Sequence, residues 1–210
     1  MNNAIRPHIG RPAGSLQRQR QPRAIATRSA ILEASAATFD TEGYAAASIN
    51  TIIANSRITK GALYFHFASK GSIAHQLIED WDAVVAQAFS SAAETGEPVV
   101  TQLRSIFATL ARHVDEDRTV RAGMKLTLDP SVEGANTSYR RWIDNTSDLV
   151  EVAIASGEIK DTSHGHRLAW NLCAGFSGAA NTVAVLREDL DLPARVDDLL
   201  TAHLSLVLGG

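Results

Sequence analysis

The 210-residue sequence predicts an all-α protein with about nine helices. Three observations support this fold class. Apolar residues recur at three- and four-residue spacings along most of the chain, which is the period of an amphipathic helix. No segment alternates apolar and polar residues as a half-buried strand does. Capping residues and Gly or Pro breaks divide the periodic stretches into units of helical length. Apolar residues make up 45% of the chain, which is enough for a packed core and excludes general disorder.

The first element, residues 1–23, is expected to be a flexible basic arm. It contains five Arg, three Pro and no acidic residue, so it has almost no apolar surface to bury. Gly10-Arg11-Pro12 could offer one Arg to a narrow minor groove. The alternative is a solvated tail that adds only non-specific attraction to a polyanion.

Residues 24–70 are expected to form three helices. Ile25, Leu32, Ala36 and Phe39 share one face of the first helix, which Gly43 ends. Ser48 and Thr59 are the expected N-caps of two short helices. Their apolar stripes consist of Ile49, Ile52 and Ile53 in one and Leu63 and Phe67 in the other. Two short helices joined by a tight turn and preceded by a longer helix indicate a helix-turn-helix domain.

Residues 71–210 are expected to form a second helical domain. Its long first helix, capped by Ser69, runs to Gly96 and Pro98. Five further apolar stripes follow, separated by breaks at Asp129-Pro130, Gly157 and Pro193. Trp81 and Trp170 are expected in the core. The last two stripes, residues 168–183 and 196–207, suit a four-helix bundle formed with a second copy of the chain.

The charge distribution assigns different tasks to the two domains. Residues 1–70 carry nine Lys/Arg against three Asp/Glu, and residues 71–210 carry eleven against twenty. A near-neutral total of −3 therefore combines a basic first third with an acidic remainder. We expect the first third to contact a polyanion.

The segment 59–70 carries the most specific chemistry. If Leu63 and Phe67 turn inward, the other side chains of this helix face solvent. Lys60 could donate to guanine acceptors in the major groove, and Gly61 permits close approach to bases. Tyr64 and His66 could donate to phosphates, and Lys70 could clamp one at the start of the next helix. The full set of candidate DNA-contacting residues is Ser48, Arg57, Thr59, Lys60, Gly61, Ala62, Tyr64, Phe65, His66 and Lys70. The alternative is that these aromatic residues only pack.

Residues 28–77, with the core T-K-G-A-L-Y-F-H-F-x-S-K, resemble the DNA-binding domain of TetR-family transcriptional repressors, and more narrowly the γ-butyrolactone-receptor-like group. The resemblance implies a homodimer whose third helix reads the major groove of a palindromic operator and whose C-terminal domain binds a small inducer. Lys60 and Gly61 match base-contacting positions of the family, and Tyr64, His66 and Lys70 match phosphate contacts. Two positions depart from the family pattern: Arg57 replaces a usual Gly, and Gly71 replaces a usual acidic residue.

A second, looser resemblance to the receptor group covers Val120–Leu126 and Tyr139–Trp142. It implies that Trp142 lines a ligand pocket for a γ-butyrolactone, butenolide or furan-type signal. Without the resemblance, a Trp at helical spacing is more often a core residue. The candidate pocket residues are Phe107, Leu110, Met124, Leu128, Trp142 and Trp81.

Other functional classes lack support in the sequence. The single Cys173 can form neither an intramolecular disulfide nor a Cys-rich zinc site, which favours the cytoplasm. The apolar stretch 172–186 is too short to cross a membrane. Gly175-Phe176-Ser177-Gly178 lacks the spacing of a nucleophile elbow, and His164-Gly165-His166 reads as a polar loop or helix start rather than a metal site. We expect no cofactor and no enzyme. The alternatives are a TetR-like activator, or a small-molecule-binding protein or enzyme without gene regulation.

Overall fold

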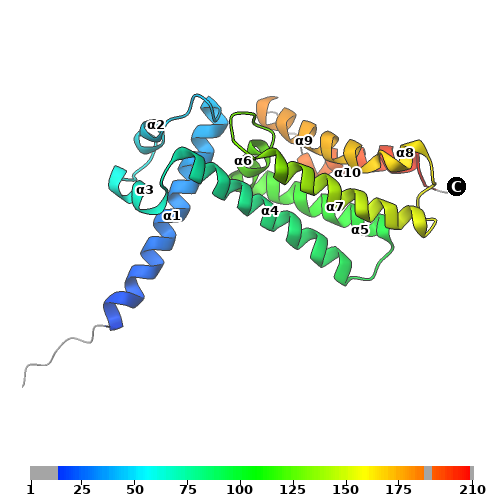
Figure 1. Ribbon diagram of the computed structural model, residues 1–210, viewed down its shortest axis with the longest axis horizontal. Helices are drawn as coiled ribbons and strands as arrows, with labels where there is room; N and C mark the ends of the chain where they lie inside the picture. Colours follow the sequence, from blue (N-terminus) through cyan, green and yellow to red (C-terminus); the bar gives the residue numbers. More distant parts are fainter. Residues whose placement is uncertain (1–13, 187–190, 209–210) are drawn as a thin grey trace, which may run out of the picture.

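The computed structural model describes residues 14–186 and 191–208, and over these residues it contains ten α-helices and no strand. A small unit formed by α1 to α3 lies at one end of a longer helical bundle (Figure 1). The all-α prediction is confirmed. The helix beyond the expected nine is α8 (Ser163–His166), a single turn whose start is capped by the hydroxyl of Thr162.

The N-terminal unit consists of α1 (Gly14–Glu42), α2 (Ile49–Ala54) and α3 (Lys60–His66). Gly43 ends α1 with a φ of 78°, a conformation that glycine adopts at little cost. The Ser48 hydroxyl accepts from the backbone N–H of Thr51, and the Thr59 hydroxyl accepts from that of Ala62. Both predicted N-caps are therefore confirmed.

The start of α1 differs from the prediction. The expected boundary between a flexible arm and a helix at residue 23 is wrong, because α1 already begins at Gly14. Residues 15–21 consist mostly of Leu, Gln and Arg, which are strong helix formers, and the helix continues through Pro22. The remaining arm, including Gly10-Arg11-Pro12, lies outside the described residues.

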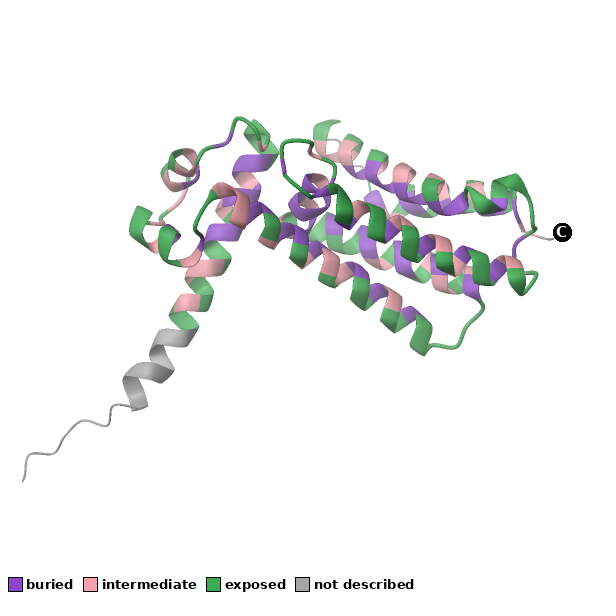
Figure 2. Cartoon of the chain, viewed as in Figure 1, coloured by how far each residue is buried: buried purple, intermediate pink, exposed green. Residues whose placement is uncertain are grey.

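The buried stripe of α1 begins later than predicted. Ile25 is 69% exposed. Figure 2 shows that the buried positions of α1 lie near the bundle, away from the projecting end of the helix. The side chains that α1 contributes to the core are Ile31, Leu32, Ala36 and Phe39.

The bundle is built from the longer helices that follow. Their bounds are α4 (Lys70–Glu94), α5 (Val99–Glu116), α6 (Arg118–Leu126), α7 (Asn136–Ala155), α9 (Leu168–Leu186) and α10 (Leu192–Ser205). Ser69 and Ser72 form a capping box at the start of α4. The short α6 lies where the bundle meets the N-terminal unit (Figure 1). Within the described residues, no helix combines the length and apolar character that a membrane crossing requires.

Two hydrophobic cores divide the chain. The first holds Leu63 and Phe67 and extends along α4 to Ile78, beyond the expected domain boundary at residue 70. The second begins at Trp81 and fills the bundle. Trp170, expected in the core, is 62% exposed, because its neighbours Leu168, Ala169 and Leu172 occupy the inward face of α9. Both α4 and α6 contribute buried residues to both cores.

Candidate DNA-binding surface and sensor core

Helix α3 presents one buried and one exposed side. Leu63 and Phe67 are buried in the first core, as predicted from their spacing. Lys60, Gly61 and Tyr64 are exposed on the other side, and Phe65 is 80% exposed. An aromatic side chain this exposed beside a lysine leaves an amphipathic surface free to contact a partner.

The predicted DNA-contacting residues differ in how far they are exposed. Ser48, Arg57, Thr59, Lys60, Gly61, Tyr64 and Phe65 are exposed, whereas Ala62, His66 and Lys70 are half-buried. The ring of Phe65 stands edge-on to His66 at 5.1 Å between centroids. A Cβ added to Gly61 would meet no atom within 4 Å, so the protein itself leaves this position open for close approach.

The turn between α2 and α3 is stabilised by Ser56. Its hydroxyl donates to the carbonyl of Ile53 at 3.2 Å and accepts from the N–H of Ile58 at 3.3 Å. The side chain of Arg57 is left exposed, and it lines a shallow groove against α1 together with Thr59 and Ala62. The turn therefore closes without the glycine that is usual in the family.

Lys70, which the sequence predicts to contact a phosphate, has hydrogen-bond partners within the protein. Its ammonium group donates to the carbonyl oxygens of Tyr44 at 2.7 Å, Ala47 at 2.8 Å and Ala45 at 3.4 Å. It also lies 4.4 Å from the centre of the Tyr44 ring. An ammonium group has three protons, and three carbonyls accept them here. Lys70 thus fixes the connection between α1 and α2 against the start of α4.

We predict that Lys70→Met destabilises the protein by about 1–2 kcal/mol, because the carbonyls lose a charged donor. Thermal unfolding followed by circular dichroism measures the effect. Lys60→Ala is the matched control: it removes an exposed lysine from the same unit and should leave the melting temperature unchanged. An unchanged melting temperature in Lys70→Met, combined with weaker DNA binding, would restore the phosphate role.

The second core brings five of the six predicted pocket residues into one buried cluster, namely Trp81, Phe107, Leu110, Met124 and Trp142. The ring of Trp142 lies 5.5 Å from Trp81 and 5.9 Å from Phe107 between centroids. Leu128 does not belong to it and is 47% exposed. It follows Met124 by four residues, but α6 ends at Leu126 and the chain turns away from the core.

Two aromatic residues of this cluster were missing from the predicted set. Phe176 and Tyr139 lie 5.4 Å and 5.7 Å from Trp142 between ring centroids. The sequence could have indicated both residues, since Phe176 lies on an apolar stripe and Tyr139 precedes Trp142 by three residues on the same helix. Burial raises the pKa of Tyr139, whose hydroxyl accepts a hydrogen bond from Ser177.

The cluster contains two buried polar atoms without partners. Within the described part of the chain, the indole N–H groups of Trp81 and Trp142 have no hydrogen-bond acceptor, although both nitrogen atoms are buried. An unpaired buried donor costs about 1–3 kcal/mol, so natural cores contain few. An acceptor oxygen placed between these rings would relieve that cost.

Groups suited to other chemistry do not assemble into a site. Among the residues that the structure describes, no cluster of His, Cys, Asp and Glu could hold a metal ion. His166 instead lies between Glu151 and Asp161, whose hydrogen bonds raise its pKa. Burial raises the pKa of Cys173 to about 12, which leaves it an unreactive thiol. Gly175–Gly178 lies inside α9, as expected for a helical segment.

Comparison with known proteins identifies the family of the chain. Residues 31–77 match the model for bacterial regulatory proteins of the tetR family. The A-factor receptor protein of Streptomyces griseus is 33% identical over 142 residues, which cover 67% of this chain and 49% of that protein. The TetR regulator TylP of Streptomyces fradiae is 32% identical, with a TM-score of 0.64 over 90% of this chain and 83% of its own. CprB of Streptomyces coelicolor, solved with its operator sequence, is 25% identical, with a TM-score of 0.76 over 89% and 90% of the two chains.

The exposed α3 and these similarities define a helix-turn-helix transcriptional regulator. The chain belongs to the TetR family. Within that family, the match to the A-factor receptor protein agrees with the resemblance to the γ-butyrolactone-receptor group. The matched family model and TylP are both described as regulators.

Proposed function

We propose that the protein is a ligand-released transcriptional repressor, which binds a palindromic operator as a homodimer in the cytoplasm. The inducer is a small γ-butyrolactone, butenolide or furan-type signal. One observation carries the proposal: an exposed recognition helix and a buried aromatic cluster with two unpaired N–H donors are connected by the continuous helix α4.

The homodimer is proposed to form through α9 and α10. These helices pack against each other, and their outer surfaces carry the exposed apolar side chains Trp170, Val185 and Leu186, with Leu206 directly after α10. Pairing the two helices with those of a second copy makes a four-helix bundle that covers this surface. A two-fold dimer places two α3 helices in successive major grooves, whose centres are about 34–36 Å apart.

We call the aromatic cluster around Trp142 the sensor core, and its chemistry favours an uncharged, largely apolar ligand. Its walls are aromatic and aliphatic, and the unpaired polar groups at its centre are donors. A ring carrying carbonyl and ether oxygens supplies acceptors for the indole N–H groups and an apolar body for the walls. A relative is named as a receptor, the A-factor receptor protein, which supports a ligand-responsive function here.

Release of DNA follows from the position of α4. Leu77 lies in the first core and Trp81, one turn later, in the second. A ligand that separates Trp81 from Trp142 therefore shifts α4 and, with it, the spacing of the two recognition helices. The ligand must bind the shifted state better by the coupling free energy, typically about 1–3 kcal/mol.

We predict that Trp142→Phe keeps operator affinity within about twofold but weakens release by the ligand at least ~10-fold. The substitution preserves an aromatic ring while removing one N–H donor. Fluorescence anisotropy of labelled operator, titrated with a panel of synthetic γ-butyrolactones, butenolides and furans, measures both quantities. Trp170→Phe makes the same change at an exposed position and should respond normally. Unaltered release from the Trp142→Phe variant would contradict the pocket assignment.

A further inference from the structure

Helix α6 connects the two cores more directly than its length suggests. Ala122 and Leu126 are buried in the first core, whereas Val120 and Met124 are buried in the second. Met124 belongs to the same cluster as Trp142. A change in the sensor core therefore reaches α6, and α6 contacts α1 of the DNA-binding unit.

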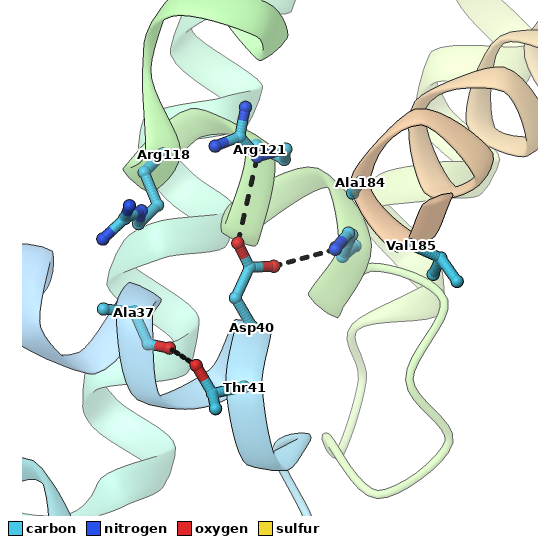
Figure 3. Close-up of a pocket in the computed structure, with 8 residues that line it drawn as sticks. Ala37, Asp40, Thr41, Arg118, Arg121, Ala184 and Val185 are labelled. Atoms are coloured by element: carbon cyan, nitrogen blue, oxygen red, sulfur yellow. Dashed lines mark hydrogen bonds and ion pairs between the residues drawn. The ribbon is translucent and has the colours of Figure 1, made fainter. Parts of the chain in front are cut away.

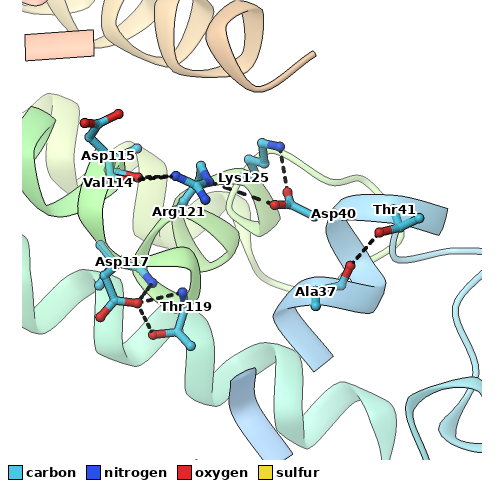
Figure 4. A network of polar contacts seen from close by, with 10 residues as sticks. Ala37, Asp40, Thr41, Val114, Asp115, Asp117, Thr119, Arg121 and Lys125 are labelled. Atoms are coloured by element: carbon cyan, nitrogen blue, oxygen red, sulfur yellow. Dashed lines mark hydrogen bonds and ion pairs between the residues drawn. The ribbon is translucent and has the colours of Figure 1, made fainter. Parts of the chain in front are cut away.

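A single carboxylate joins α1 to α6 through charge. Asp40 lies 2.8 Å from the ammonium nitrogen of Lys125 and 3.9 Å from Nε of Arg121 (Figure 4). The three side chains are between 23% and 25% exposed, so solvent screens this contact less than it screens a surface ion pair. We call Asp40, Arg121 and Lys125 the α1–α6 clamp.

Arg121 also connects the clamp to α5 of the helical bundle. Its Nη1 donates to the carbonyl oxygens of Val114 at 2.8 Å and Asp115 at 3.1 Å, which belong to the last turn of α5. The same guanidinium thus contacts α1 of one domain and α5 of the other. An Arg that donates in several directions transmits a displacement of either helix to the other.

The clamp lies beside a pocket of about 390 Å³, where it has room to open (Figure 3). The pocket is lined by α1, α6 and the end of α9, and Arg118 lines it one turn before Arg121. By contrast, the other side of α6 is held tightly against α4, because a Cβ on Gly123 would lie 2.1 Å from the Leu77 carbonyl oxygen. The clamp therefore adds a charged contact to the apolar packing of Ala122 and Leu126 against the DNA-binding unit.

We propose that the α1–α6 clamp is a regulatory latch, which holds the DNA-binding unit in its operator-binding orientation and opens when the sensor core takes up its ligand. This inference rests on the proposed function. In the present structure the sensor core is filled by its own aromatic rings, and the clamp is closed. Asp40 is a positioning residue, since it contacts neither the α3 surface nor the aromatic cluster.

The latch and simple charge repulsion predict opposite changes in operator affinity when the charge of Asp40 is removed. Removing an acidic charge from a DNA-binding unit ordinarily strengthens DNA binding, because repulsion of phosphates decreases. If Asp40 holds the latch, Asp40→Asn instead weakens operator binding by about fivefold. Glu42→Gln removes the same charge from an exposed position two residues away, and it should leave affinity unchanged or slightly raised.

The experiment measures operator affinity by fluorescence anisotropy and amide hydrogen exchange in residues 31–42 and 118–126. Asp40→Asn should weaken binding and raise exchange in both segments. The conservative variant Asp40→Glu keeps a carboxylate between Lys125 and Arg121 and should retain affinity to within about twofold. Binding of Asp40→Asn equal to that of Glu42→Gln, or a loss in Asp40→Glu as large as that in Asp40→Asn, would overturn the latch. If the wild-type chain binds no operator, the proposed function fails, whereas the exchange data still decide whether the clamp joins the two domains.

Discussion

Replacing Tyr64 with alanine is expected to weaken operator binding ~10-fold or more while leaving the melting temperature unchanged. Tyr64 lies on the exposed side of α3, between the exposed residues Gly61 and Phe65, so it contributes little to the core. Loss of one hydrogen bond to a charged phosphate group typically costs about 1.5–3 kcal/mol of binding free energy. A gel-shift titration against the operator, paired with thermal unfolding, measures both effects.

The neighbouring Leu63 provides the contrast for this experiment. Leu63 is fully buried, so Leu63→Ala should lose about 2–5 kcal/mol of stability and bind DNA poorly only because it unfolds. Tyr64→Ala should separate binding from folding, whereas Leu63→Ala should not. A Tyr64→Ala protein that titrates like the wild type would remove Tyr64 from the DNA-binding surface.

Substitution of Gly123 by alanine is expected to destabilise the protein by about 3 kcal/mol or more. The added Cβ would lie 2.1 Å from the carbonyl oxygen and 2.8 Å from the carbonyl carbon of Leu77, and 3.1 Å from Cβ of Trp81. These are mostly backbone atoms of a helix and cannot rotate away. Urea unfolding measures the loss, which should be accompanied by displacement of α6 from α4.

Gly61→Ala is the matched glycine control. Its Cβ would meet no protein atom within 4 Å, so stability should be kept or raised by about 0.5–1 kcal/mol, the helix propensity difference. Operator binding should nevertheless fall, because the methyl group stands on the side of α3 that we propose approaches bases. If the Gly123→Ala variant unfolds at the same urea concentration as the wild type, the contact between α4 and α6 is looser than described.

Local chemistry explains which features the sequence predicted well. The caps Ser48 and Thr59 and the inward positions Leu63 and Phe67 depend on residues three or four apart, whose geometry a helix fixes. The aromatic cluster was largely predicted because the resemblance to a receptor family indicated Trp142 and periodicity supplied its neighbours. Such features require no knowledge of how the helices are arranged.

Features that depend on tertiary contacts were not predicted. The carbonyl partners of Lys70 lie 23 to 26 residues earlier in the chain, so no local pattern indicates them. The sequence alone therefore suggests only a phosphate partner for Lys70. Asp40 and Lys125 are 85 residues apart, and no sequence pattern relates them. Leu128 continued the spacing of Met124, but the helix ends between them, and such an ending depends on the packing of α6 against both domains.

The most direct test of the central claim is selection of bound DNA from a random duplex pool by the full-length protein. The account predicts a palindromic consensus, whose half-sites are centred about one helical turn or a whole multiple apart and whose binding weakens steeply with salt. Recovery of no consensus, or of an unsymmetric one without regular half-site spacing, would contradict a dimeric regulator that reads its operator through α3.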